Sequence, residues 1–134
     1  MRSVTTYIRR SPDACWKVLT DASVLNGWVP GLRRANVVAT DAAGLAREIH
    51  FEFSTSLTYT LVYTYDAAAR EMRWEPRLGK RDAVRGMARL EPFDEGTRLV
   101  YELEHGHGRA AADQELGDLE SLVAAFARWM HDER

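Results

Sequence analysis

The stretch LAREIHFEFSTSLTYTLVYTY, residues 45–65, decides the fold, because apolar and polar residues alternate along it on both sides of a short polar break. A period of two is the pattern of a β-strand with one buried face. It predicts two strands, Leu45–Phe53 and Leu57–Tyr65, joined by Ser54-Thr55-Ser56. One face of this hairpin carries Leu45, Arg47, Ile49, Phe51, Phe53, Leu57, Tyr59, Leu61, Tyr63 and Tyr65. Because the opposite face is polar, we expect a sheet with one side in water.

The length of the break sets the register of the hairpin. Three loop residues keep both apolar faces on the same side of the sheet, which places Phe51 opposite Tyr59 and Arg47 opposite Tyr63. The same reasoning at the next turn places Tyr63 opposite Trp74. An arginine on an inner face is costly unless it meets water, a carboxylate, an aromatic ring or a ligand oxygen. We therefore expect Arg47 to anchor an oxygen of a bound molecule; the alternative is an arginine that reaches water at the rim of the sheet.

Outside this hairpin, the same kind of pattern predicts five further strands, two short helices and one long helix. The strands are expected at Ser3–Arg9, Arg33–Thr40, Met72–Leu78, Ala83–Leu90 and Thr97–His105. The helices are expected at Ser11–Asp21, around Ser23–Leu25, and at Arg109–Asp132, where Leu116, Leu119, Val123, Phe126 and Met130 recur at helical spacing. Short turns between consecutive strands favour an antiparallel meander. Pro76 is the exception in its strand and predicts a bulge or a strand end.

Length, charge and cysteine content narrow the class of protein. The chain has 134 residues, which suits one domain over residues 1–134, and its 46% hydrophobic and 28% charged residues are typical of a globular protein. A net charge of -2 gives no support for nucleic-acid binding. Cys15 is the only cysteine, so an intramolecular disulfide is excluded and a reducing compartment is expected. No secretory leader is visible, and the apolar run at residues 122–127 is too short to span a membrane, so we expect a cytoplasmic protein without membrane insertion.

The inner face of the predicted sheet combines aromatic, small and polar residues. The sixth strand offers Gly86 and Ala88 in the middle of its apolar face, and the seventh offers Tyr101 and His105. Buried hydroxyl groups need hydrogen-bond partners. A partly hydrated cavity between the sheet and the long helix would supply them; alternatively, these groups lie at the sheet rim and reach water. The strand pattern leaves both interpretations open.

Several stretches along the chain together resemble one known family. They are Ser11-Pro12-Asp13-Ala14-Cys15-Trp16, Thr20-Asp21, Trp28-Val29-Pro30-Gly31, Arg85-Gly86, Arg89-Leu90-Glu91-Pro92-Phe93, Asp94-Glu95-Gly96-Thr97-Arg98 and Leu119–Trp129. In their order along the chain, they resemble the START/Bet v 1-like (SRPBCC) superfamily, in its polyketide cyclase/dehydrase and coenzyme Q-binding-like branch. The resemblance implies an α+β helix-grip fold, in which a seven-stranded antiparallel sheet wraps around a long C-terminal helix and two short helices follow the first strand.

The resemblance also implies a cavity between the sheet and the C-terminal helix that holds an apolar or amphipathic small molecule. We expect binding of a lipid, quinone or polyketide-like molecule there, without catalysis. The first alternative is a polyketide cyclase or dehydratase that acts on a poly-ketone in the same cavity. The second is an interaction module of the chaperone-activator kind. A fold shared by carriers and enzymes does not choose between these activities, and the oligomeric state is left open.

The residues expected to contact the ligand lie on the inner face of the sheet or at the mouth of the cavity. They are Trp28, Arg47, Phe51, Tyr59, Tyr63, Trp74, Tyr101 and His105. No catalytic residue is assigned, because the motifs of hydrolases, kinases and dinucleotide-binding oxidoreductases are absent from the sequence; a general base at His105 is the alternative to a strand-end histidine near water. His105 and His107 share one strand face without a third ligand at suitable spacing, so neither a metal nor another cofactor is expected.

Overall fold

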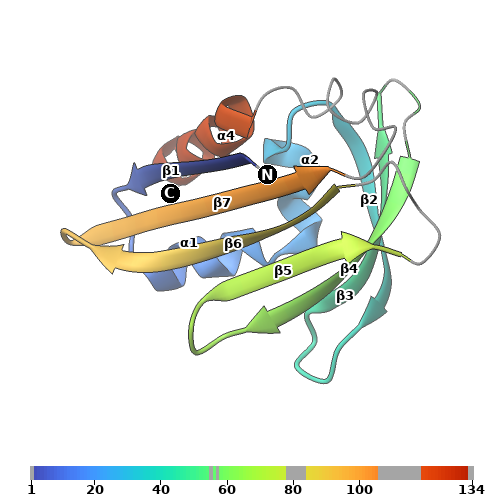
Figure 1. Cartoon of the computed structure of the whole chain (residues 1–134), viewed down its shortest axis with the longest axis horizontal. Coiled ribbons are helices and arrows are strands. Elements are labelled where there is room, and N and C mark those ends of the chain that lie inside the picture. The colour runs from blue at the N-terminus through green and yellow to red at the C-terminus, as the bar shows by residue number, and fades with distance from the viewer. Residues whose placement is uncertain (1, 55, 57, 78–83, 106–118, 133–134) are drawn as a thin grey trace.

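The computed structural model describes residues 2–54, 56, 58–77, 84–105 and 119–132. Seven strands form one antiparallel sheet in the order β1-β7-β6-β5-β4-β3-β2 (Figure 1). The strands are β1 (Arg2–Ile8), β2 (Leu32–Thr40), β3 (Ala46–Phe53), β4 (Thr58–Asp66), β5 (Glu71–Pro76), β6 (Val84–Phe93) and β7 (Gly96–His105). The helices are α1 (Pro12–Leu19), the 3-10 turn η1 (Ala22–Val24), α2 (Leu25–Trp28) and α4 (Leu119–Asp132). The predicted α+β helix-grip architecture is confirmed.

The described elements differ from the predicted ones mainly at their ends. The predictions for Thr55, Leu57, Leu78, Ala83, His107 and residues 109–118 lie outside the described residues. The short helix expected around Ser23–Leu25 is a 3-10 turn followed by α2, which continues to Trp28. The Trp28 ring is buried, and the Val29 N–H donates to the Leu25 carbonyl at 2.9 Å. Burial of this ring therefore extends the helical turn beyond the predicted boundary.

Local sequence explains where α1 begins. The Ser11 hydroxyl accepts a hydrogen bond from the Ala14 N–H at 3.1 Å, and Pro12 occupies the first turn, where its missing N–H costs nothing. The buried face of α1 carries Cys15 and Leu19. This helix therefore starts at the predicted cap and turns its apolar side toward the core.

The helices gather on one side of the sheet (Figure 1). α4 packs against β1, which is one edge of the sheet, and α2 contacts α4. Val123, Phe126 and Met130 of α4 are buried in the core between helices and sheet, and burial of such a side chain contributes about 1.5–3 kcal/mol. Among the helices of the described residues, none is long and apolar enough to cross a membrane.

The central strands have the predicted register. Phe51 pairs with Tyr59 between β3 and β4, and Tyr63 pairs with Trp74 between β4 and β5. These four side chains are buried, as the alternation of the sequence predicts. The register therefore brings aromatic rings from three neighbouring strands to the same inner face of the sheet.

The predicted inner-face position of Arg47 is wrong. β3 buries Ala46 and Ile49, which are three residues apart, and leaves Arg47 exposed. Strand β2 pairs with Ala46 and Glu48 but skips Arg47, which marks a β-bulge. The Tyr65 hydroxyl donates to the Ala46 carbonyl at 2.5 Å on the inner side of this irregularity. Because a bulge shifts the alternation by one residue, Arg47 reaches solvent and does not anchor a ligand inside the sheet.

Candidate functional site

Aromatic side chains on the inner face of the sheet line a pocket beneath the helices, called the inner pocket below. Six of the predicted ligand contacts line it: Trp28, Phe51, Tyr59, Tyr63, Trp74 and Tyr101. Leu25 of α2 and Leu122 of α4 contribute from the helix side. Arg47 is not part of the wall, because the β3–β4 pairing ends at Glu48 and never brings Arg47 opposite β4. His105 is the last residue of β7, and its side chain lies outside the described part of the structure.

The rings of the inner pocket form a continuous layer across the strands. The Trp74 ring centroid lies 5.9 Å from that of Tyr63 and 5.4 Å from that of Tyr101. Strand β6 separates β5 from β7, and Gly86 of β6 lets the indole pass, since a Cβ there would lie 2.9 Å from Trp74 Cζ2. On the helix side, Trp28 stands edge-on to Phe126 at 4.9 Å. Aromatic pairs of this kind contribute about 0.5–1.5 kcal/mol beyond their burial.

The inner pocket is much smaller than expected. Its volume is about 60 Å³, whereas small-molecule sites usually measure roughly 300–1,000 Å³. For the described residues, the expectation of an open cavity of ligand size is therefore wrong. The physical reason is that the rings of this layer lie against one another and fill the space between sheet and helices. A molecule larger than a few atoms fits only if some of these rings move.

The wall of the inner pocket carries a hydrogen-bond donor without a partner. Trp28 Nε1 is buried and makes no hydrogen bond. Within the described part of the chain, no hydrogen bond joins the hydroxyl of Tyr63 or Tyr101 to another residue, in contrast to the hydroxyl of Tyr65. An unpaired buried donor costs about 1–3 kcal/mol. The residues that line the pocket are thus mostly apolar, and those among them that carry hydrogen-bond donors include Trp28, Tyr63 and Tyr101.

Burial keeps the phenols of Tyr63 and Tyr101 protonated. It raises the pKa of Tyr63 well above the usual value near 10, and the neighbouring Tyr101, Tyr65 and Tyr59 raise it further. Burial also raises the pKa of Tyr101. A neutral phenol donates a hydrogen bond but is not a base at neutral pH. Among the described residues that line the inner pocket there is neither a carboxylate nor a histidine, so the wall offers donors and no general base.

Sequence reasoning missed part of this wall. Phe53 shares the apolar face with Phe51, and Leu122 belongs to the buried stripe of α4, so the same alternation and helical spacing could have identified both. The unpaired Nε1 of Trp28 has no sequence signal, because it depends on how α2 seats the ring. As for metals, the residues that the structure describes contain no group of three or more His, Cys, Asp or Glu placed to hold an ion.

Comparison with known proteins identifies the family. A family model described as polyketide cyclase / dehydrase and lipid transport matches residues 2–132. The chain belongs to this family. The resemblance inferred from the sequence motifs is confirmed, and the polyketide cyclase/dehydrase and lipid transport family accounts for nearly the whole chain. No curated protein sequence matches the chain.

Solved structures of other proteins share the fold of this chain over almost its whole length. TTHA0849 from Thermus thermophilus has a TM-score of 0.78 and 18% identity, over 96% of this chain and 95% of that one. A START superfamily protein from Mycobacterium smegmatis has a TM-score of 0.77 and 14% identity, over 97% and 96%. The di-domain ARO/CYC StfQ of the steffimycin biosynthetic pathway has a TM-score of 0.74 and 15% identity, over 100% of this chain and 46% of that one. At these identities the likeness shows a shared fold.

Proposed function

We propose that this protein binds an apolar small molecule carrying a carbonyl or phenol oxygen, in the inner pocket between the sheet and α4. The observation that carries the proposal is the unpaired Nε1 of Trp28 in the wall of an otherwise apolar pocket. One ligand oxygen would accept from this donor and a second from the hydroxyl of Tyr63 or Tyr101, which would remove the cost of leaving a buried donor unpaired. Quinones and polyketide-like molecules combine such oxygens with flat apolar rings, and the family includes proteins of polyketide chemistry and lipid transport.

Binding of such a molecule requires the inner pocket to widen. The present volume of about 60 Å³ holds no bicyclic ligand. Aromatic side chains have only two side-chain torsions and move as rigid plates, so rotation of one ring opens a flat space against its neighbours. The layer formed by Tyr63, Trp74 and Tyr101 is of this kind. A flat ligand that intercalates into the layer would keep the apolar contacts that the rings now make with each other.

Cyclisation or dehydration of a poly-ketone is the second candidate function. The donors that would hold a ketone oxygen would also polarise it, which assists attack at the carbonyl carbon. Forming the carbon nucleophile requires removal of a proton, and the described wall offers no base for that step. Binding is therefore the better supported of the two. For an interaction module, the described residues offer single exposed apolar side chains such as Val37 and Val38 on the edge strand β2, which do not make a large patch.

The proposal is tested by titrating the protein with two molecules that share a carbon skeleton, of which only one carries oxygen. Menadione carries two quinone oxygens, and methylnaphthalene has the same carbon skeleton without them. We expect calorimetry to show menadione binding about 30-fold to 150-fold more tightly, the equivalent of two hydrogen bonds of about 1–1.5 kcal/mol each. Equal affinities, or no binding of either molecule, would contradict the proposal.

Tyrosine variants locate the effect. Tyr101→Phe removes a hydroxyl from the inner pocket and should weaken menadione binding by about fivefold while leaving methylnaphthalene unaffected. Tyr7→Phe is the matched control, because the Tyr7 hydroxyl donates to the Asp94 carbonyl at the surface, far from the inner pocket. If both variants weaken menadione binding to the same extent, the Tyr101 hydroxyl does not donate a hydrogen bond to a menadione oxygen.

A further inference from the structure

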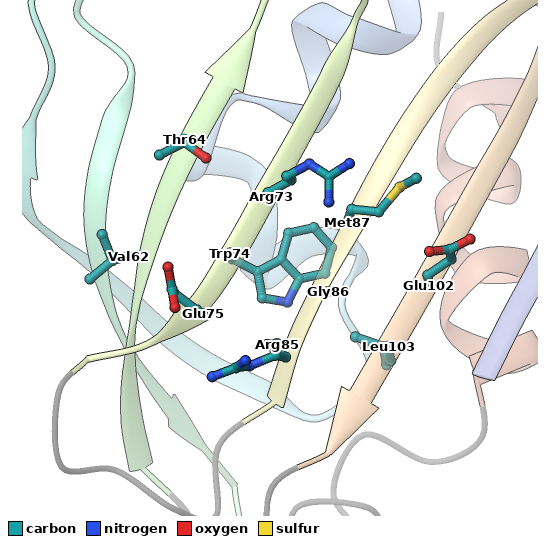
Figure 2. Close-up of a pocket in the computed structure, with 10 residues that line it drawn as sticks. All are labelled: Val62, Thr64, Arg73, Trp74, Glu75, Arg85, Gly86, Met87, Glu102 and Leu103. Carbon is teal, nitrogen blue, oxygen red and sulfur yellow. The ribbon is translucent and has the colours of Figure 1, made fainter. Parts of the chain in front are cut away.

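A second pocket lies on the outer face of the sheet, opposite the helices, and is called the outer pocket below. Figure 2 shows the side chains that line it, and its volume is about 270 Å³. Outward-facing residues of four strands surround it, among them Val62 of β4, Arg73 of β5 and Arg85 of β6. Trp74 and Leu103 line both this pocket and the inner pocket. These two side chains are therefore shared walls between the outside of the sheet and its interior.

The sheet is open at this place because two neighbouring strands stop pairing. The β5–β6 ladder ends where Trp74 meets Gly86. Beyond that point β5 continues to Pro76, which pairs with β4, while β6 begins at Val84, which pairs with β7. The main chains of Glu75–Pro76 and Val84–Arg85 thus lie on either side of a gap, called the β5–β6 split. Pro76 has no N–H to offer across it, which fits the irregularity expected from the sequence.

The side chain of Trp74 closes the β5–β6 split. Figure 2 shows the indole reaching from β5 across to β6, beside Gly86. A Cβ at position 86 would lie 2.9 Å from Trp74 Cζ2 and 3.0 Å from Leu103 Cδ2, so the glycine is what lets the indole settle there. Only 5% of Trp74 is exposed. The split is therefore sealed by a side chain and not by hydrogen bonds between the strands.

We propose that the ligand reaches the inner pocket through the β5–β6 split, with the outer pocket as its first binding site and Trp74 as the gate. This inference rests on the proposed function. Turning the indole aside breaks ring contacts but no main-chain hydrogen bond, because the strands are not paired beyond Gly86. It also joins the two spaces, and their combined volume reaches the lower end of small-molecule sites, roughly 300 Å³.

The rim of the outer pocket indicates which molecules can enter. It carries two cations and two anions: Arg73, Arg85, Glu75 and Glu102. Arg73 is held by Glu71 at 2.7 Å, and Arg85 is exposed. The charges balance, so the rim does not select a strongly charged molecule, while Trp74 and Met87 offer an apolar floor. An uncharged, flat molecule with one or two polar oxygens fits this surface.

The route is tested by blocking the outer pocket from outside. In Arg85→Cys, the new thiol is exposed at the rim, whereas the native Cys15 is fully buried, so a bulky uncharged maleimide reacts at position 85. Menadione association is then followed by stopped-flow quenching of tryptophan fluorescence, in the labelled variant and in the parent, because a free thiol at position 85 would itself add to the quinone ring. We expect the label to slow association at least about tenfold, with dissociation slowed in step, because access rather than affinity is changed.

The same label elsewhere provides the control. Val37 is exposed and lines a separate groove of about 580 Å³ between α1, η1 and β2, another large opening of the described surface. Labelled Val37→Cys should bind menadione at the parent rate. Trp74→Leu, which shortens the gate, should speed both association and dissociation, by about tenfold.

The association rate decides the outcome. An unchanged rate in labelled Arg85→Cys, or equal slowing by the label at position 37, overturns the route while the proposed function stands. Slowing of both association and dissociation by the label at position 85 alone supports the route, whereas slower association with unchanged dissociation overturns it, because affinity and not access would then be changed. If calorimetry shows that the unlabelled parent binds no menadione, the proposed function fails and the route fails with it.

Discussion

Replacing Phe126 with alanine is expected to lower the free energy of unfolding by about 3–5 kcal/mol, the usual cost of emptying a buried aromatic position. Phe126 is 1% exposed and lies on the face of α4 that packs into the core. Its ring stands edge-on to Trp28 at 4.9 Å, so it also holds α2 in place. The loss should appear in urea denaturation as a lower midpoint with an unchanged slope.

Phe93→Ala is the matched control for Phe126→Ala. The Phe93 side chain is 48% exposed and contacts Tyr7 and Arg98 at the surface. Its removal should cost less than about 1 kcal/mol, because little apolar surface returns to water. Comparable losses in the two variants would show that α4 is not anchored in the core through Phe126.

Gly86→Ala is expected to destabilise the protein by about 3 kcal/mol, the upper part of the range for overpacking. The added Cβ would collide with the Glu102 carbonyl oxygen and would lie 2.9 Å from the Trp74 ring. A main-chain oxygen cannot rotate away as a flexible side chain can, so β6 or β7 must shift. Denaturation curves of the parent and variant measure the loss.

Gly44→Ala separates crowding from main-chain strain. Gly44 has a φ of +88°, and a Cβ there would meet nothing within 4 Å. Its replacement should cost only the strain of the left-handed conformation, about 1–2 kcal/mol. If Gly86→Ala destabilises the protein no more than Gly44→Ala does, Trp74 and the Glu102 carbonyl do not pack closely against Gly86.

Much of the fold follows from the alternation of residues along the chain. The pairing of Tyr63 with Trp74 was predictable, because the number of turn residues fixes which side chains share a face. The Ser11 cap was also predictable from local sequence, because a hydroxyl just before Pro12 can accept a hydrogen bond from a free N–H group in the first turn of the helix. These features depend on a few neighbouring residues, which a sequence displays directly.

The sequence-based predictions are wrong where the position of a residue depends on how one strand or helix packs against another. Alternation places Arg47 inward, but a single extra residue in β3 moves it to solvent, and nothing in the local pattern marks that bulge. The volume of the inner pocket depends on how rings from several strands fit together, so composition could not predict that Trp74 would fill it. Pro76 signalled an irregular strand, yet only the structure shows that β5 follows β4 there while β6 follows β7.

The central claim, that a ligand oxygen accepts a hydrogen bond inside the inner pocket, is tested most directly at Trp28. The chain has four tryptophans, whose indole N–H groups give separate signals in a heteronuclear NMR spectrum. With menadione, the Trp28 indole proton should move downfield, because its buried Nε1 gains an acceptor that it now lacks. Methylnaphthalene, which has no oxygen, should not cause this downfield shift. A Trp28 signal that stays in place while menadione binds would contradict the account.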